Sequence, residues 1–129
     1  MILDGVPVSC INKAALEYHI PALAIVSILE TERGKVGTAS VNKNGSIDYG
    51  PMQINSLWLK KLNKYGYTKE DIQYNACINA EVGTWILAQN IANGKNWWHG
   101  VGGYNSFTPN LNLKYSMKIK NNYEMLTSL

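Results

Sequence analysis

The longest helical pattern in the chain runs from Ala76 to Asn93, and the rest of the fold has to be built around it. Its apolar positions recur at helical spacing and give a broad face for burial: Ala80, Gly83, Leu87 and Ile91, flanked by Trp85 and Ile86. Gly94 follows as an expected helix end. A chain of 129 residues is long enough for one core and too short for two ordinary domains. Residues 1–129 are therefore predicted to form a single domain.

The remaining pattern is also helical, with one interruption. Asn44-Gly45 lies between the β-favouring residues Val41 and Ile47, which predicts a small hairpin or loop at about 37–50. A first helix is expected after Ser9 as its cap, with Cys10, Ala14, Leu16 and Ile20 buried. Further helical segments are expected at Pro21–Arg33, Gln53–Leu62, Trp97–Tyr104 and Leu111–Met125, and a short helical turn is expected after Thr68 as its cap. The fold class is thus predicted to be all-α with a small hairpin.

Charge and composition exclude several functions. The net charge is +3, but Arg33 is the one arginine, so a nucleic-acid partner is not expected. The longest apolar stretch, Pro21 to Leu29, is interrupted by Ser27 and is far shorter than the roughly 20 residues that span a bilayer, so no membrane span is expected. Neither cysteine has a histidine at ligand spacing, and there is no CxxC, so no metal or other cofactor is expected.

Cys10 and Cys77 are the two cysteines of the chain. They are either unreactive core residues or one disulfide, and we prefer the disulfide, which would stabilise the fold by about 4 kcal/mol in the chain-entropy model. A disulfide implies an oxidising compartment. Residues 1–9 hold no adequate hydrophobic segment, so we expect any signal peptide to be absent from this sequence.

Three carboxylates are candidates for chemistry. Glu30 ends the apolar run of the second helix, where burial would raise its pKa as a general acid requires; a helix-end role is equally compatible with its position. Glu32 lies two residues after Glu30 and is expected to be a solvated surface carboxylate beside Arg33. Asp48 follows the hairpin turn and is either a second cleft carboxylate or a turn residue that bonds its own backbone.

Three motifs occur in order: Glu30-Thr31, then Gly50-Pro51-Met52-Gln53-Ile54-Asn55, then Gly103-Tyr104-Asn105-Ser106. Together they resemble the Glu-Ser, Gly-Leu-Met-Gln and Ala-Tyr-Asn motifs of lytic transglycosylases with the goose-type lysozyme-like fold. The resemblance runs from Cys10 to Tyr115 and is nearest to the specialised enzymes of secretion, conjugation and type IV pilus systems. Cysteines at these two places are also usual in those enzymes, which supports the disulfide.

The resemblance implies a reaction and its residues. Glu30 would protonate the glycosidic oxygen between N-acetylmuramic acid and N-acetylglucosamine, and then take a proton from the muramic C6 hydroxyl as that oxygen closes on C1. The product is a 1,6-anhydro sugar, and no water is consumed. The remaining assignments are substrate binding by Thr31, Met52, Gln53, Tyr104 and Asn105, and orientation of Glu30 by Tyr115, which could equally be an ordinary packed tyrosine.

The motifs depart from the family pattern at three positions. Thr31 replaces the family's usual serine and keeps a hydroxyl. Gly103 replaces the usual alanine and is expected to loosen its helix. Pro51 stands for leucine, which removes an N–H and puts the backbone geometry before Gln53 in question.

Two other functions stay open. The stretch Asn44 to Ser56 also looks like the corresponding part of animal c-type lysozymes, so the alternative is a hydrolase that uses Glu30 with Asp48. The other is a non-catalytic glycan-binding module with stacking surfaces from Trp97, Trp98, Tyr104 and Tyr49. If the chain is a lytic transglycosylase, as we favour, we expect a periplasmic monomer that acts on peptidoglycan strands, with components of a secretion or pilus machine as its partners.

Overall fold

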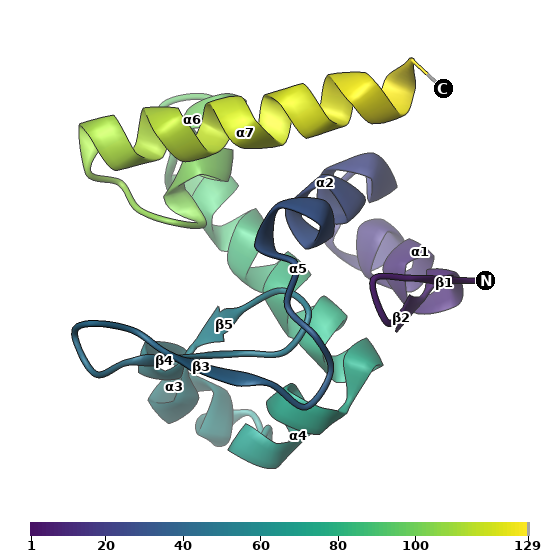
Figure 1. Ribbon diagram of the computed structural model, residues 1–129, viewed down its shortest axis with the longest axis vertical. Helices are drawn as coiled ribbons and strands as arrows, with labels where there is room; N and C mark the ends of the chain where they lie inside the picture. Colours follow the sequence, from purple (N-terminus) through teal and green to yellow (C-terminus); the bar gives the residue numbers. More distant parts are fainter. Residues whose placement is uncertain (129) are drawn as a thin grey trace.

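The computed structural model describes residues 1–128 as a mostly helical fold with two small antiparallel sheets (Figure 1). The elements in chain order are β1 (Ile2–Leu3), β2 (Val6–Pro7), α1 (Val8–Tyr18), α2 (Ala22–Glu32), β3 (Ala39–Val41), β4 (Ile47–Tyr49), β5 (Ile54–Asn55), a 3-10 turn (Ser56–Trp58), α3 (Leu59–Lys64), α4 (Lys69–Tyr74), α5 (Ala76–Asn93), α6 (Trp97–Gly103) and α7 (Pro109–Thr127). The predicted helical class with a hairpin within 37–50 is confirmed.

Helix α5 is the centre of the molecule, with the predicted bounds Ala76–Asn93. The side chain of Asn75 accepts a hydrogen bond from the Ile78 N–H and caps its first turn. Helices α1, α4 and α6 pack against it. At its middle, Gly83 leaves room for the side chain of Met52, whose Sδ would lie 2.4 Å from a Cβ added there. The central helix therefore supports the segment that joins β4 to β5.

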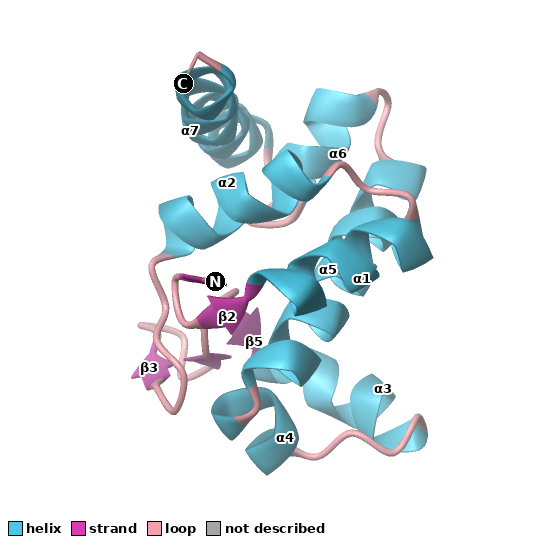
Figure 2. Cartoon of the chain, turned by 90° about the vertical axis from the view of Figure 1, so that its right-hand side faces the viewer, coloured by secondary structure: helices cyan, strands magenta, loops and turns pink. Residues whose placement is uncertain are grey.

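Helix α2 lies between α1 and α7. It buries every residue from Ala24 to Leu29, as its apolar sequence predicts, and is followed by Arg33 in the left-handed conformation. Figure 2 shows α2 with α7 on one side and α1 on the other. Helix α7 packs along α2 and α6, so the far end of the chain covers the end of α2. This packing decides the environment of the carboxylates at that end.

The larger sheet has the order β3-β4-β5. Its first pair is the predicted hairpin, with Ser40 opposite Asp48, and β5 then pairs with β4 through Asp48 and Asn55. The predicted helix from Gln53 is wrong in its first half: Gln53 has φ +52°, and Ile54 and Asn55 form β5. Regular helix begins only at Leu59, after the 3-10 turn.

The amino-terminal region is tied to α5 by the Cys10–Cys77 disulfide, whose Cα atoms lie 5.4 Å apart, so the predicted pairing is confirmed. Helix α1 begins at Val8 and not at a Ser9 cap. The expected burial of Leu16 is wrong, because its side chain is 79% exposed. Across residues 1–128 no helix is long and apolar enough to cross a membrane. The same residues contain no group of three or more His, Cys, Asp or Glu side chains placed to hold a metal ion.

Candidate active site

A cleft of about 470 Å³ lies between the sheet and the helical part of the fold. The sheet side supplies most of its polar groups, and the helical side supplies the end of α2, two residues of α5 and the end of α6. The residues that line it are Glu32, Asn42, Asn44, Ser46, Asp48, Gln53, Ile54, Asn55, Leu57, Trp58, Ile86, Asn90, Gly103, Tyr104 and Asn105. An elongated polar polymer with amide and hydroxyl groups fits such a lining.

Glu32 is the carboxylate that α2 presents to this cleft. The Tyr115 hydroxyl donates a hydrogen bond of 2.5 Å to its Oε2 atom. The pKa of Glu32 is raised to about 7, chiefly by burial and in smaller part by the charge of Asp48, while the Tyr115 hydrogen bond and Lys118 act to lower it. A carboxyl group with a pKa near neutrality can both give and take a proton at neutral pH.

Glu30 lies elsewhere, so the prediction that it faces the cleft is wrong. Its pKa is also raised, but chiefly by a hydrogen bond to Asp4 in the amino-terminal hairpin. The expected hydrogen bond from Tyr115 goes to Glu32 instead. Two residues on a helix are separated by about 200°, so one of the two carboxylates turns toward α7 and the cleft while the other turns toward β1 and β2. The expectation of a solvated Glu32 is corrected for the same reason.

Asp48 faces the same cleft from β4. Its Oδ1 accepts a 2.9 Å hydrogen bond from the Asn55 side chain on the neighbouring strand. Asn55 also donates to the Ser46 hydroxyl at 3.0 Å, and so does Asn42. The carboxylate of Asp48 is thus held by a network across the sheet and does not bond its own turn.

The segment Gly50 to Gln53 is a turn that brings Gln53 to the cleft. Gln53 donates its N–H to the Gly50 carbonyl at 3.0 Å, which makes a tight turn with Pro51 at its second position, where proline is favoured and no N–H is needed. Pro51 therefore fits the backbone geometry before Gln53. Gln53 lines the cleft as predicted, but Met52 does not: its side chain is fully buried against Gly83.

Tyr104 and Asn105 line the cleft from the end of α6, as predicted. The Tyr104 hydroxyl donates 2.6 Å to the Met52 carbonyl, and its ring stacks on Tyr115 with centroids 6.3 Å apart. Burial raises the pKa of Tyr104 well above its ordinary value, so the hydroxyl stays a donor. A Cβ at Gly103 would lie 2.2 Å from the Phe107 ring, so this glycine allows a close contact and does not merely loosen the helix.

Thr31 is not a cleft residue, contrary to the prediction. Its hydroxyl donates to the Ser27 carbonyl and accepts from Asn122 on α7, both at 2.8 Å, so it joins two helices. Tyr49, expected as a stacking surface, is 3% exposed, and neither Trp97 nor Trp98 lines the cleft.

Sequence reasoning missed several cleft residues, among them the asparagines of the hairpin and Asn90 on α5. The signal that could have found Glu32 is Gly34. A Cβ there would lie 1.9 Å from the Gly50 carbonyl oxygen, so only glycine lets the chain after α2 approach the turn that carries Gln53.

Residues 9–125 match the family model described as "Transglycosylase SLT domain". The chain is 35% identical over 100 residues to Protein IpgF of Shigella flexneri, a match that covers 77% of this chain and 66% of that protein. It is 31% identical over 125 residues to Invasion protein IagB of Salmonella typhimurium, covering 93% of this chain and 78% of that protein. A third relative, a peptidoglycan-binding-like protein of Escherichia coli O157:H7, is 32% identical over 133 residues, with 94% of this chain and 80% of that protein covered. Because the family model spans nearly the whole chain and these relatives agree, the predicted lysozyme-like class is confirmed, and the chain belongs to the transglycosylase SLT domain family of lytic transglycosylases.

Proposed function

We propose that this chain cleaves the bond between N-acetylmuramic acid and N-acetylglucosamine in peptidoglycan, with Glu32 as its single acid and base. The observation that carries the proposal is a carboxyl group with a pKa of about 7 that faces a polar cleft and accepts a hydrogen bond from Tyr115. Family membership supports the substrate class.

In this mechanism the protonated Glu32 donates its proton to the glycosidic oxygen as the bond to C1 of the muramic acid breaks. The sugar's own N-acetyl group stabilises the positive charge that develops at C1. The Glu32 carboxylate then removes the proton of the C6 hydroxyl, and that oxygen bonds to C1. The products are a free 4-hydroxyl on one sugar and a 1,6-anhydro ring on the other, and Glu32 ends the cycle protonated.

Gln53, Tyr104 and Asn105 are proposed to bind the glycan, since each lines the cleft that Glu32 faces. Tyr104 also stacks on the ring of Tyr115, whose hydroxyl bonds Glu32. Tyr115 is a positioning residue, because it acts on Glu32 and does not line the cleft.

A second candidate reaction is hydrolysis by Glu32 with Asp48. The observation that favours it is that Asp48 faces the same cleft and is held there by Asn55. In that case the Asp48 carboxylate would stabilise the charge at C1, and a water molecule would add to it, so the product would carry a reducing end one water heavier.

Mass spectrometry of the fragments released from purified peptidoglycan separates these reactions. Anhydro ends support the transglycosylase, and hydrated ends support the hydrolase. Glu32→Gln is expected to lower turnover by at least a thousandfold, about 4 kcal/mol of transition-state stabilisation. Glu30→Gln is the matched control, since it removes a carboxylate two residues away on the same helix, and it is expected to keep nearly full activity.

The opposite pattern, in which Glu30→Gln is inactive and Glu32→Gln active, would overturn the assignment. Asp48→Asn refines the result: a loss of a few-fold is expected for the transglycosylase, whereas a loss comparable to that of Glu32→Gln returns Asp48 to the mechanism.

The cellular role proposed is local opening of the cell wall for a secretion, conjugation or pilus apparatus, by a monomer in the periplasm. The Cys10–Cys77 disulfide supports an oxidising compartment. One of the relatives is named an invasion protein, which supports a role in contact with other cells. Cell fractionation with alkylation of free thiols tests the compartment, because the protein should resist alkylation in the periplasmic fraction before reduction.

A further inference from the structure

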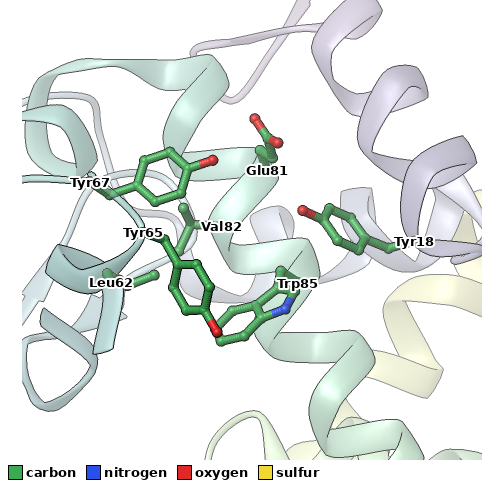
Figure 3. A pocket seen from close by; sticks show the side chains of 7 residues that line it. All are labelled: Tyr18, Leu62, Tyr65, Tyr67, Glu81, Val82 and Trp85. Atoms are coloured by element: carbon green, nitrogen blue, oxygen red, sulfur yellow. The ribbon is translucent and has the colours of Figure 1, made fainter. Parts of the chain in front are cut away.

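A second cavity, of about 320 Å³, lies between α1, α5 and the segment that joins α3 to α4 (Figure 3). It shares no lining residue with the cleft. Four of its seven lining side chains are aromatic, one is a carboxylate, and none is basic: Tyr18, Leu62, Tyr65, Tyr67, Glu81, Val82 and Trp85. The proposed mechanism makes no use of these groups.

The cavity has one polar end and one apolar end. At the polar end, the hydroxyl groups of Tyr18 and Tyr67 point toward each other beside the carboxylate of Glu81 (Figure 3). At the other end lie the rings of Tyr65 and Trp85, with centroids 6.3 Å apart and planes inclined at 61°. Two hydroxyl groups and one carboxylate therefore meet at one end of a cavity whose other end has aromatic walls.

The polar end is negatively charged. Burial and the charges of Glu17 and Glu81 raise the pKa of Tyr18 to about 12, so this hydroxyl stays protonated and does not add charge. Within residues 1–128 no lysine or arginine nitrogen lies within 4.0 Å of the Glu81 carboxylate, since the ion pair found at that distance joins Lys69 and Glu70. The carboxylate is thus available to a cation that enters the cavity.

The aromatic end is already in contact with a cation of this chain. The Lys61 ammonium lies 5.3 Å from the Trp85 ring centroid and 6.0 Å from that of Trp58. Ammonium groups at such distances are attracted by the negative face of an indole ring. Lys61 does not line the cavity, and it shows that the Trp85 ring accepts an alkylammonium in this fold.

We propose that this cavity binds the side chain of a lysine presented by a protein partner. A lysine ammonium has three N–H donors, which match the two tyrosine hydroxyls and the Glu81 carboxylate. Its four methylene groups would lie along Tyr65 and Trp85 over an apolar base. A quaternary ammonium has no N–H and would leave these oxygens without donors. A zwitterionic amino-acid end, as in diaminopimelate, would bring a second carboxylate toward Glu81.

The site adjoins the back of the catalytic cleft. Trp85, which lines the cavity, meets Trp58, which lines the cleft, edge to face with ring centroids 5.6 Å apart. A partner held through its lysine would therefore be attached directly behind the wall of the cleft, on a surface that leaves the glycan path free.

The test is a titration of the whole chain by NMR, followed at the Trp85 indole N–H. The probe is Nα-acetyl-lysine-N-methylamide, and its Nε-acetyl and Nε-trimethyl forms are the matched comparisons. We expect saturable shifts with the lysine probe, binding at least about tenfold weaker for both modified probes and for diaminopimelate, and about tenfold weaker binding of the lysine probe to Glu81→Gln. Glu70→Gln, the same charge change on an exposed side chain of α4, is expected to bind as the wild type does.

The proposal is overturned if the lysine probe gives no saturable shift, or if the Nε-acetyl form binds equally well. Tighter binding of the trimethyl form would point to a quaternary ammonium, and tighter binding of diaminopimelate to a peptidoglycan stem; either result also overturns it. Tyr65→Ala gives a second variant, because Tyr65 is 67% exposed and its loss leaves the core intact. It is expected to weaken the lysine probe several-fold, and unchanged binding would contradict the aromatic wall.

Discussion

Replacing Tyr115 with phenylalanine removes one hydroxyl group and keeps the ring that stacks on Tyr104. In the wild type that hydroxyl donates to Glu32 and favours the charged form, so it opposes the effect of burial and is one of the causes that together give a pKa of about 7. A hydrogen bond to a charged group is worth about 1.5–3 kcal/mol, and one pKa unit corresponds to about 1.4 kcal/mol. The pKa of Glu32 is therefore expected to rise by about 1–2 units in Tyr115→Phe.

The direction of the pH effect follows from the role of the acid. Glu32 has to be protonated in order to donate a proton to the glycosidic oxygen, so activity falls as the pH rises through its pKa. In Tyr115→Phe the alkaline limb of the kcat/KM profile is expected to move to higher pH by about 1–2 units. The profile is measured by the release of soluble fragments from peptidoglycan. Carbon NMR of the glutamate side-chain carboxyls gives the same quantity without relying on turnover.

Tyr123→Phe is the control, because it removes a hydroxyl from the same helix at a site beside Trp98. It is expected to leave the alkaline limb in place. An alkaline limb that stays fixed in Tyr115→Phe, or that moves to lower pH, would refute the reasoning that Tyr115 acts through the charged form of Glu32.

Two further predictions concern stability. Asn79 is fully buried, and its side chain bonds three backbone groups, so Asn79→Ala is expected to lower the free energy of unfolding by about 3 kcal/mol or more in urea denaturation, whereas the exposed Asn63→Ala should change it little. Glu32 has its pKa raised on folding from 4.5 to about 7, so its contribution to stability is full below about pH 4.5 and is lost as the pH rises through about 7. Glu32→Gln is expected to flatten this part of the pH dependence, worth up to about 3 kcal/mol, and an unchanged slope of stability against pH would contradict the buried carboxyl.

The parts of the fold that follow from local signals could be predicted from the sequence. The bounds of α5 follow from its apolar periodicity and the glycine after it. The cap at Thr68 is present as a full capping box, in which Thr68 and Asp71 bond each other's backbone N–H groups. The hairpin follows from Asn44-Gly45, because Gly45 takes the positive φ that the turn needs.

Elements that depend on distant partners could not be predicted in this way. Ile54 and Asn55 have an apolar-polar pattern compatible with a helix, and they form β5 only because β4 lies beside them. The buried position of Met52 depends on Gly83 and on Asn79, whose side chain accepts the Met52 N–H at 2.8 Å. These contacts join residues about thirty positions apart, so no window of sequence contains them.

The choice between Glu30 and Glu32 has the same cause. Both lie at the end of a helix that is apolar on nearly all sides, so periodicity gives no polar face from which to decide. The decision comes from Tyr115, 83 residues away, which meets Glu32 because α7 packs along α2. Residue Thr31 between them is held to α7 by Asn122, which fixes the rotation of this last helical turn. With that turn fixed, Glu32 faces the cleft and Glu30 the amino-terminal hairpin, so the motif match at Glu30-Thr31 lies two residues from the carboxylate that the fold brings to the cleft.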